Sequence, residues 1–120
     1  MDGYYIGLMS GTSCDGIDGV IAAFSDNAVN ILASDHLPFD LQLKGKLNFL
    51  QQLSFSSSDP FELAAVAANE LTDCYAVVVN HMLQKATLSP QDIRAIGCHG
   101  QTIRHWPALS YSLQISNPAQ

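Results

Sequence analysis

Three short apolar runs within the first 37 residues constrain the fold of this chain most strongly. They cover residues 4–10, 17–24 and 29–37, and short stretches of Gly, Ser, Thr, Asp and Asn separate them. Apolar runs of this length, bounded by such turn-forming residues, are typical of β-strands. Because short connections join antiparallel strands, the sequence predicts an opening antiparallel meander of three strands.

Two helices are predicted next. Residues 40–53 carry Leu at positions 43, 47, 50 and 53, a spacing that places the leucines on one face of a helix. After a serine linker at residues 56–58, Asp59, Pro60 and Glu62 form a strong helix start with an N-cap and a capping acid. Apolar periodicity extends this second helix to about Lys85, and its Ala-rich and Val-rich interior suits close packing on a sheet.

The last third of the chain adds strands. Residues 89–92 predict one short helical turn, residues 95–98 a small buried strand and residues 110–116 a last strand. The glycines at positions 97 and 100 predict that the small strand ends at Cys98 and delivers the following residues to an edge of the sheet. The expected fold class is α/β, with a mixed sheet, the opening meander and flanking helices.

Composition limits the size of the hydrophobic core and the kinds of partner that are expected. The chain has 120 residues, 48% hydrophobic and 13% charged, which is enough for one buried core. Five Lys and Arg against eleven Asp and Glu give a net charge of −6, and the first basic residue is Lys44. Such a chain is a poor match for nucleic acid or an anionic membrane, so neither is expected as a partner. A phosphate ligand must then be held by backbone dipoles or by a metal ion.

No targeting signal is expected from this sequence. The amino terminus lacks the basic segment of a signal peptide, and no apolar run approaches the roughly 18 residues that span a bilayer. Cys14, Cys74 and Cys98 are far apart and lack the spacing of a zinc site. We therefore expect a cytoplasmic chain with three reduced thiols.

The first candidate site is the connection between the first two predicted strands. Its glycines let the backbone approach a ligand closely, and successive N–H groups in such a turn form an anion-binding nest. Asp15 and Asp18 can hold a divalent cation through water, and that cation neutralises phosphate oxygens. The alternative is a plain hairpin turn whose Asp and Ser side chains satisfy their own backbone. The candidate phosphate-binding residues are Gly11, Thr12, Ser13, Cys14, Asp15, Gly16, Ile17 and Asp18.

The second candidate site is His99, Gln101 and Thr102. A His between two glycines at a strand end is exposed to a cleft, and the neutral Gln and Thr side chains suit sugar hydroxyls better than a triphosphate. The three residues are therefore predicted to face a sugar, while a structural role of His99 in a turn stays open. A Cys14 nucleophile with His99 as its base is disfavoured, because the adjacent Asp15 carboxylate raises the thiol pKa.

Three sequence blocks taken together resemble a known family. The blocks at residues 6–18, 95–102 and 113–118 resemble, in the same order, those of the anhydro-N-acetylmuramic acid kinase family. The resemblance implies the actin, Hsp70 and sugar-kinase fold, a ribonuclease-H-like domain in which the first strand turn cradles nucleotide phosphates. In the wider superfamily an Asp commonly stands at the position of Met9, so acidic support for a metal would come from Asp15 or Asp18.

The resemblance also implies a reaction. In the family, water opens the 1,6-anhydro ring of anhydro-N-acetylmuramic acid while the γ-phosphoryl group of ATP, bound with Mg²⁺, passes to O6, a step of peptidoglycan recycling. This chemistry needs a carboxylate base, and the family's base and adenosine-binding segments lie beyond Gln120. The resemblance thus implies that residues 1–120 are the amino-terminal part of the first actin-like domain and are inactive alone. The full-length enzyme is expected to be a homodimer.

Two other functions stay open at this point. One is a different sugar kinase or an acetate-type kinase of the same fold, which a substrate screen distinguishes. The other is a non-catalytic nucleotide-binding module, expected if the gene ends at Gln120. In either case the 120-residue chain by itself is expected to expose apolar surface and self-associate, because the long helix and the meander are parts of a larger sheet.

Overall fold

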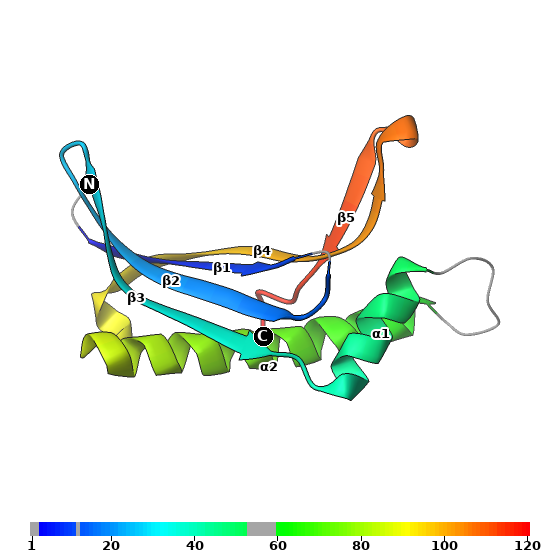
Figure 1. Cartoon of the computed structure of the whole chain (residues 1–120), viewed down its shortest axis with the longest axis horizontal. Coiled ribbons are helices and arrows are strands. Elements are labelled where there is room, and N and C mark those ends of the chain that lie inside the picture. Colours follow the sequence, from blue (N-terminus) through cyan, green and yellow to red (C-terminus); the bar gives the residue numbers. More distant parts are fainter. Residues whose placement is uncertain (1–2, 12, 53–59) are drawn as a thin grey trace.

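A computed structural model describes residues 3–11, 13–52 and 60–120 of the chain. Five strands form one mixed sheet in the order β3-β2-β1-β4-β5, with two helices beside it (Figure 1). The predicted α/β class is confirmed, and the architecture is consistent with the amino-terminal domain of an actin-like ATPase. The elements are β1 (Tyr4–Ser10), β2 (Gly16–Ser25), β3 (Ala28–Pro38), α1 (Leu41–Gln51), α2 (Pro60–Ala86), a 3₁₀ turn (Pro90–Asp92), β4 (Ile93–Trp106), a second 3₁₀ turn (Pro107–Leu109) and β5 (Tyr111–Ile115).

The opening meander is confirmed. Strand β2 is antiparallel to both β1 and β3, with Ile6 opposite Ile21 in one pair and Val20 opposite Ser34 in the other. Strand β4 joins the free side of β1 in the parallel direction. Strands β3 and β4 therefore run in the same direction, and the crossover connection that this requires contains the two helices.

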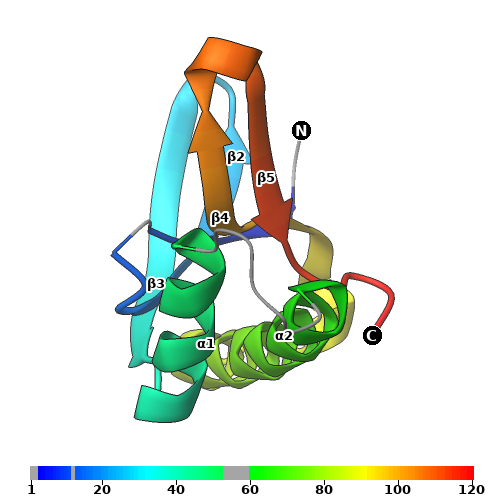
Figure 2. The ribbon, with the colours of Figure 1, turned by 90° about the vertical axis from the view of Figure 1, so that its right-hand side faces the viewer.

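Both helices cover the same face of the sheet (Figures 1 and 2). Alternate residues of the strands point toward the helices, so Ile6 and Leu8 of β1 share the core with Ile17 and Ile21 of β2. The helices add a stripe of apolar side chains to the same core: Leu43, Leu47 and Leu50 from α1, and Ala67, Leu71, Tyr75, Val78, Met82 and Leu83 from α2. The predicted packing of the long helix on the sheet is thus confirmed.

The ends of the helices follow local capping chemistry. Helix α1 begins after Asp40, whose Oδ1 accepts a hydrogen bond of 2.8 Å from the backbone N–H of Leu43. Helix α2 begins at Pro60, as predicted, and ends at Ala86. The predicted serine linker at residues 56–58 and the predicted N-cap Asp59 lie outside the described residues. In the part that the structure does describe, no helix is long and apolar enough to cross a membrane.

The second face of the sheet, here called the outer face, carries no helix among the described residues (Figure 1). It exposes apolar side chains, among them Met9, Val20 and Phe24, which are 54%, 37% and 37% exposed. The radius of gyration is 15.9 Å, against about 14 Å for a compact domain of this length. The expectation that the chain exposes apolar surface is therefore confirmed.

Strand β4 differs from the prediction. It continues past Cys98 to Trp106, so the expected turn after Cys98 is wrong. Gly100, at φ +80°, forms a bulge and does not end the strand. Beyond the bulge β5 continues the ladder, because it pairs antiparallel with β4 from Gln101 to Trp106. The residues expected at a sheet rim therefore lie in the middle of a long strand.

Candidate functional site

The connection between β1 and β2 is a tight turn. The backbone N–H of Cys14 donates a 3.1 Å hydrogen bond to the carbonyl oxygen of Gly11, which closes the turn. Cys14 takes the left-handed conformation, with φ at 57°, which is uncommon for a residue other than glycine. Ser13 is exposed and Gly11 is half-buried, so solvent reaches the backbone of the turn. Thr12, predicted as a phosphate ligand, lies outside the described residues.

The turn is anchored at Asp15 by two later segments of the chain. The carbonyl oxygen of Asp15 accepts a 2.9 Å hydrogen bond from the backbone N–H of Phe39. Its carboxylate accepts a 3.1 Å hydrogen bond from Nζ of Lys44, at the start of α1. Hydrogen bonds from Lys44 and from Ser13 hold the pKa of the exposed Asp15 carboxyl below its ordinary value. The ammonium group of Lys44 thus lies beside the turn. The sequence analysis had expected only backbone dipoles or a metal ion to bind phosphate there.

Three of the predicted phosphate-binding residues have no side chain that could contact a ligand. The side chains of Cys14 and Ile17 are 0% exposed and belong to the core. Because the Cys14 thiol is fully buried in the core, it packs there and is not accessible as a nucleophile; burial raises its pKa, and the Asp15 charge raises it further. Gly16 is not at positive φ; a Cβ there would lie 2.4 Å from the carbonyl oxygen of Leu37, so it is glycine because β3 passes close to it. These residues can offer a ligand only their backbone.

The two carboxylates proposed for a metal have separate side-chain partners. Asp15 is bound to Lys44, whereas the Asp18 carboxylate lies 2.8 Å from Nδ1 of His36. In residues 3–11, 13–52 and 60–120, no three His, Cys, Asp or Glu side chains are grouped to hold a metal ion. Mg²⁺ bound with a nucleotide keeps several waters and phosphate oxygens as ligands and needs one or two protein carboxylates. The donor set fits such an ion and does not fit an all-protein metal cage.

The three residues predicted to face a sugar do not share one surface. His99 lines a hollow of the outer face together with Met9 and Asp18. Gln101 is 0% exposed, on the side of the sheet that the helices cover. Thr102 is half-buried, and its hydroxyl accepts a 3.2 Å hydrogen bond from Nε2 of Gln114. The β4 bulge places Gln101 on the opposite face from His99, and the alternation of successive strand residues turns Thr102 away from Gln101.

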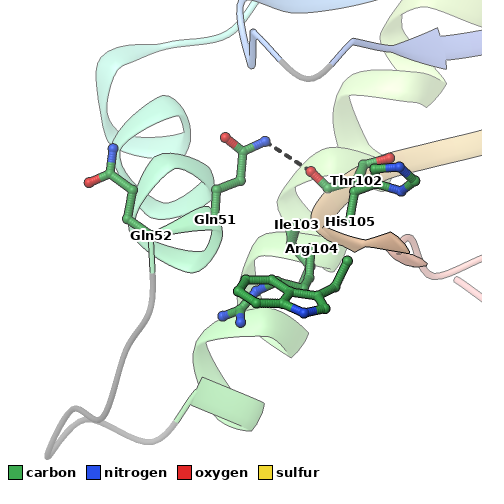
Figure 3. A pocket seen from close by; sticks show the side chains of 7 residues that line it. Gln51, Gln52, Thr102, Ile103, Arg104 and His105 are labelled. Atoms are coloured by element: carbon green, nitrogen blue, oxygen red, sulfur yellow. Dashed lines mark hydrogen bonds between the residues drawn. The ribbon is translucent and has the colours of Figure 1, made fainter. Parts of the chain in front are cut away.

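A pocket of about 390 Å³ lies between the end of α1 and the second half of β4 (Figure 3). Residues 102–106 line it from the strand, and Gln51 and Gln52 line it from the helix. Nε2 of Gln51 donates a 2.9 Å hydrogen bond to the carbonyl oxygen of Thr102, which joins the two walls. Amide, guanidinium, imidazole and indole groups meet here, a combination suited to a hydroxylated ligand. Of these residues only Thr102 was predicted as a site residue. Arg104 and Trp106, close to it in the sequence, are residue types that could have indicated a ligand-binding surface.

Comparison with known proteins connects the whole chain to one family. The sequence profile described as "Anhydro-N-acetylmuramic acid kinase" matches residues 3–120. Proteins of that name from Nitrosomonas europaea and Bordetella pertussis are 42% identical over 118 residues and 45% identical over 115 residues. The one from Burkholderia thailandensis is 44% identical over 119 residues.

The matched region covers nearly all of this chain and a minor part of each relative. It spans 97%, 96% and 98% of the chain, against 32%, 30% and 30% of the three relatives. The chain therefore spans about a third of the length of the curated relatives it matches. The turn after β1 and strand β4 both fall inside the matched region, and the chain belongs to the anhydro-N-acetylmuramic acid kinase family.

Proposed function

We propose that residues 1–120 are the amino-terminal part of the first actin-like domain of a longer ATP-dependent kinase. Its substrate is 1,6-anhydro-N-acetylmuramic acid and its product N-acetylmuramic acid 6-phosphate, in peptidoglycan recycling. The family match over residues 3–120 is the observation that carries the proposal. The use of ATP assigns the reaction to the cytoplasm, and the complete enzyme is proposed to be a homodimer.

The proposed reaction joins a hydrolysis to a phosphoryl transfer. Water bonds to the anomeric carbon C1, and the bond between C1 and O6 breaks. O6 bonds to the γ-phosphorus, ADP leaves, and a carboxylate base takes the proton of the water. We assign that base and the adenosine pocket to the part of the enzyme beyond Gln120.

Residues of this chain are proposed to hold the phosphates. Gly11 is half-buried and Ser13 is exposed, so the backbone N–H of Gly11 and the hydroxyl of Ser13 are the proposed hydrogen-bond donors to phosphate oxygens. Lys44 adds a positive charge beside them. A bound Mg²⁺ would neutralise phosphate charge, and Asp15 and Asp18 are the proposed carboxylates for its water ligands.

The pocket between α1 and β4 is the proposed sugar side. Thr102 lines it, and the chain beyond Thr102 adds Arg104 and Trp106, whose donors and ring suit hydroxyl groups and the apolar face of a sugar. His99 lies on the outer face with Asp18, so its proposed contact with the sugar requires a ligand that reaches across the strand.

The test uses the full-length gene product that contains this chain. Purified protein is incubated with ATP, Mg²⁺ and the anhydro-sugar in H₂¹⁸O, and the product is analysed by mass spectrometry. We expect one ¹⁸O at C1 and none in the phosphate group, because water attacks carbon and not phosphorus. Absence of a phosphorylated product contradicts the proposal, and faster turnover of ordinary amino sugars or acetate favours another kinase of this fold.

A further inference from the structure

Gln101 and Ser10 are the buried polar residues of the described part of the chain. Their side chains are 0% and 2% exposed, and both lie among apolar core residues. A polar group in such a place is expected to have hydrogen-bond partners, because burial without them costs about 1–3 kcal/mol. Neither side chain can touch a ligand in the solvent.

The amide of Gln101 bridges β4 to the turn after β1. Its Nε2 donates a 2.9 Å hydrogen bond to the carbonyl oxygen of Gly11 and a 3.2 Å hydrogen bond to that of Thr102. Its Oε1 accepts a hydrogen bond from the Ser10 hydroxyl. The orientation of the amide is chemically determined, because both carbonyl oxygens can only accept. A reversed amide would face oxygen with oxygen.

The bulge in β4 brings the amide to this position. Leu8 pairs with Cys98, and Ser10 pairs with Gln101, so β4 has one more residue than β1 between these pairs. Without the extra residue, Gln101 would face away from Cys98; with it, Gln101 lies on the same face as Leu8 and Ile103. The left-handed φ of Gly100 makes this step possible.

The Gln101 amide affects the turn through the carbonyl oxygen of Gly11. It accepts one hydrogen bond from the N–H of Cys14 and one from Gln101, which together use its two acceptor positions. Both donors belong to the interior side of the turn, so the oxygen is held toward the protein. An oxygen turned outward would repel the negative oxygens of a phosphate that approaches the turn.

We propose that Gln101 is a positioning residue for the nucleotide phosphates, acting through Gly11, and not a contact for the sugar. The inference rests on the proposed function, and it replaces the assignment of Gln101 to the sugar side. Ser10 belongs to the same arrangement, since its hydroxyl donates to Oε1 of Gln101 and so helps to orient the amide whose Nε2 donates to Gly11.

The experiment measures steady-state kinetics of the full-length kinase with ATP and the anhydro-sugar varied separately. In Gln101→Met the side chain keeps its length and loses the donor to Gly11. We expect the KM for ATP to rise roughly five- to tenfold, which is the size of one lost hydrogen bond, while the KM for the sugar changes less than twofold. Gln84→Met, the same change at an exposed position of α2, is the control and should alter neither KM.

Ser10→Ala is the second variant, in case Gln101→Met melts far below the wild type. It should raise the KM for ATP in the same direction by roughly two- to fivefold. A higher KM for the sugar with an unchanged KM for ATP overturns the inference, and so do unchanged KM values in folded Gln101→Met and Ser10→Ala proteins. If the wild-type protein does not phosphorylate the anhydro-sugar at all, the proposed function itself has failed.

Discussion

Replacing Gly100 by Ala should destabilise the chain through the bulge in β4. Two costs add up at this position. The left-handed φ of +80° costs an L-residue about 1–2 kcal/mol. A Cβ would also lie 2.7 Å from the carbonyl oxygen of Ile115, so β5 has to move, at a cost of about 1–2 kcal/mol. The expected loss of unfolding free energy is about 2–4 kcal/mol.

Gly97→Ala is the matched control on the same strand. Gly97 does not have a positive φ, and the nearest atom to an added Cβ is the Ile6 carbonyl oxygen at 3.9 Å. The same substitution there should change the unfolding free energy by less than about 0.5 kcal/mol. The comparison therefore isolates the conformation of Gly100 and its contact with β5.

Thermal unfolding followed by circular dichroism measures the difference. For 120 residues an unfolding entropy of about 0.25 kcal/mol/K converts each 1 kcal/mol into about 4 °C. Gly100→Ala should melt about 8–16 °C below the wild type, and Gly97→Ala within about 2 °C of it. Equal melting temperatures for the two variants would refute the argument that the bulge needs glycine.

Four further predictions concern activity, charge and association. The 120-residue chain alone should not phosphorylate the anhydro-sugar; any ATP-dependent product from it contradicts the assignment of the base beyond Gln120. In the full-length enzyme, Asp15→Asn and Asp18→Asn should raise the KM for MgATP more than that for the sugar, and an unchanged KM for ATP in both returns the turn to a structural role. Lys44 lowers the pKa of Asp15, so the stabilisation from their pair is fully present above the ordinary carboxyl pKa and is lost as the pH falls through the lowered pKa. The free energy of unfolding should therefore fall less steeply with acidification in Asp15→Asn than in the wild type. The isolated chain should self-associate through its exposed apolar surface, and a monomer at high concentration in sedimentation experiments would count against this.

Elements with strong local patterns were predictable. The meander follows from three apolar runs with short connections, and α2 follows from its periodicity and from Pro60 at its start. These patterns depend on neighbours within a few residues, so a single sequence contains them. The turn after β1 was located for the same reason, because Gly11 and Ser13 stand directly after an apolar run.

Strand β4 was mispredicted because a glycine in a strand has two interpretations. Gly100 between two polar residues is typical of a turn, and the sequence does not say that β5 lies alongside to continue the ladder. A bulge differs from a turn only in its partner strand. That partner comes from a later segment, so local chemistry could not decide between them.

The residues around the turn show what each level decided. Composition and spacing determined that a glycine-containing turn follows the first strand and that the neighbouring carboxylates outnumber nearby bases. The tertiary structure decided which side chains reach it: Lys44 arrives from a helix 29 residues after Asp15, and Gln101 from a strand 90 residues after Gly11. Gln101 is buried because a bulge reverses the face of β4, and the identity of a polar residue carries no information about such a reversal. Local sequence specifies the conformation of a segment, whereas the pairing of distant segments decides which face of that segment meets the core.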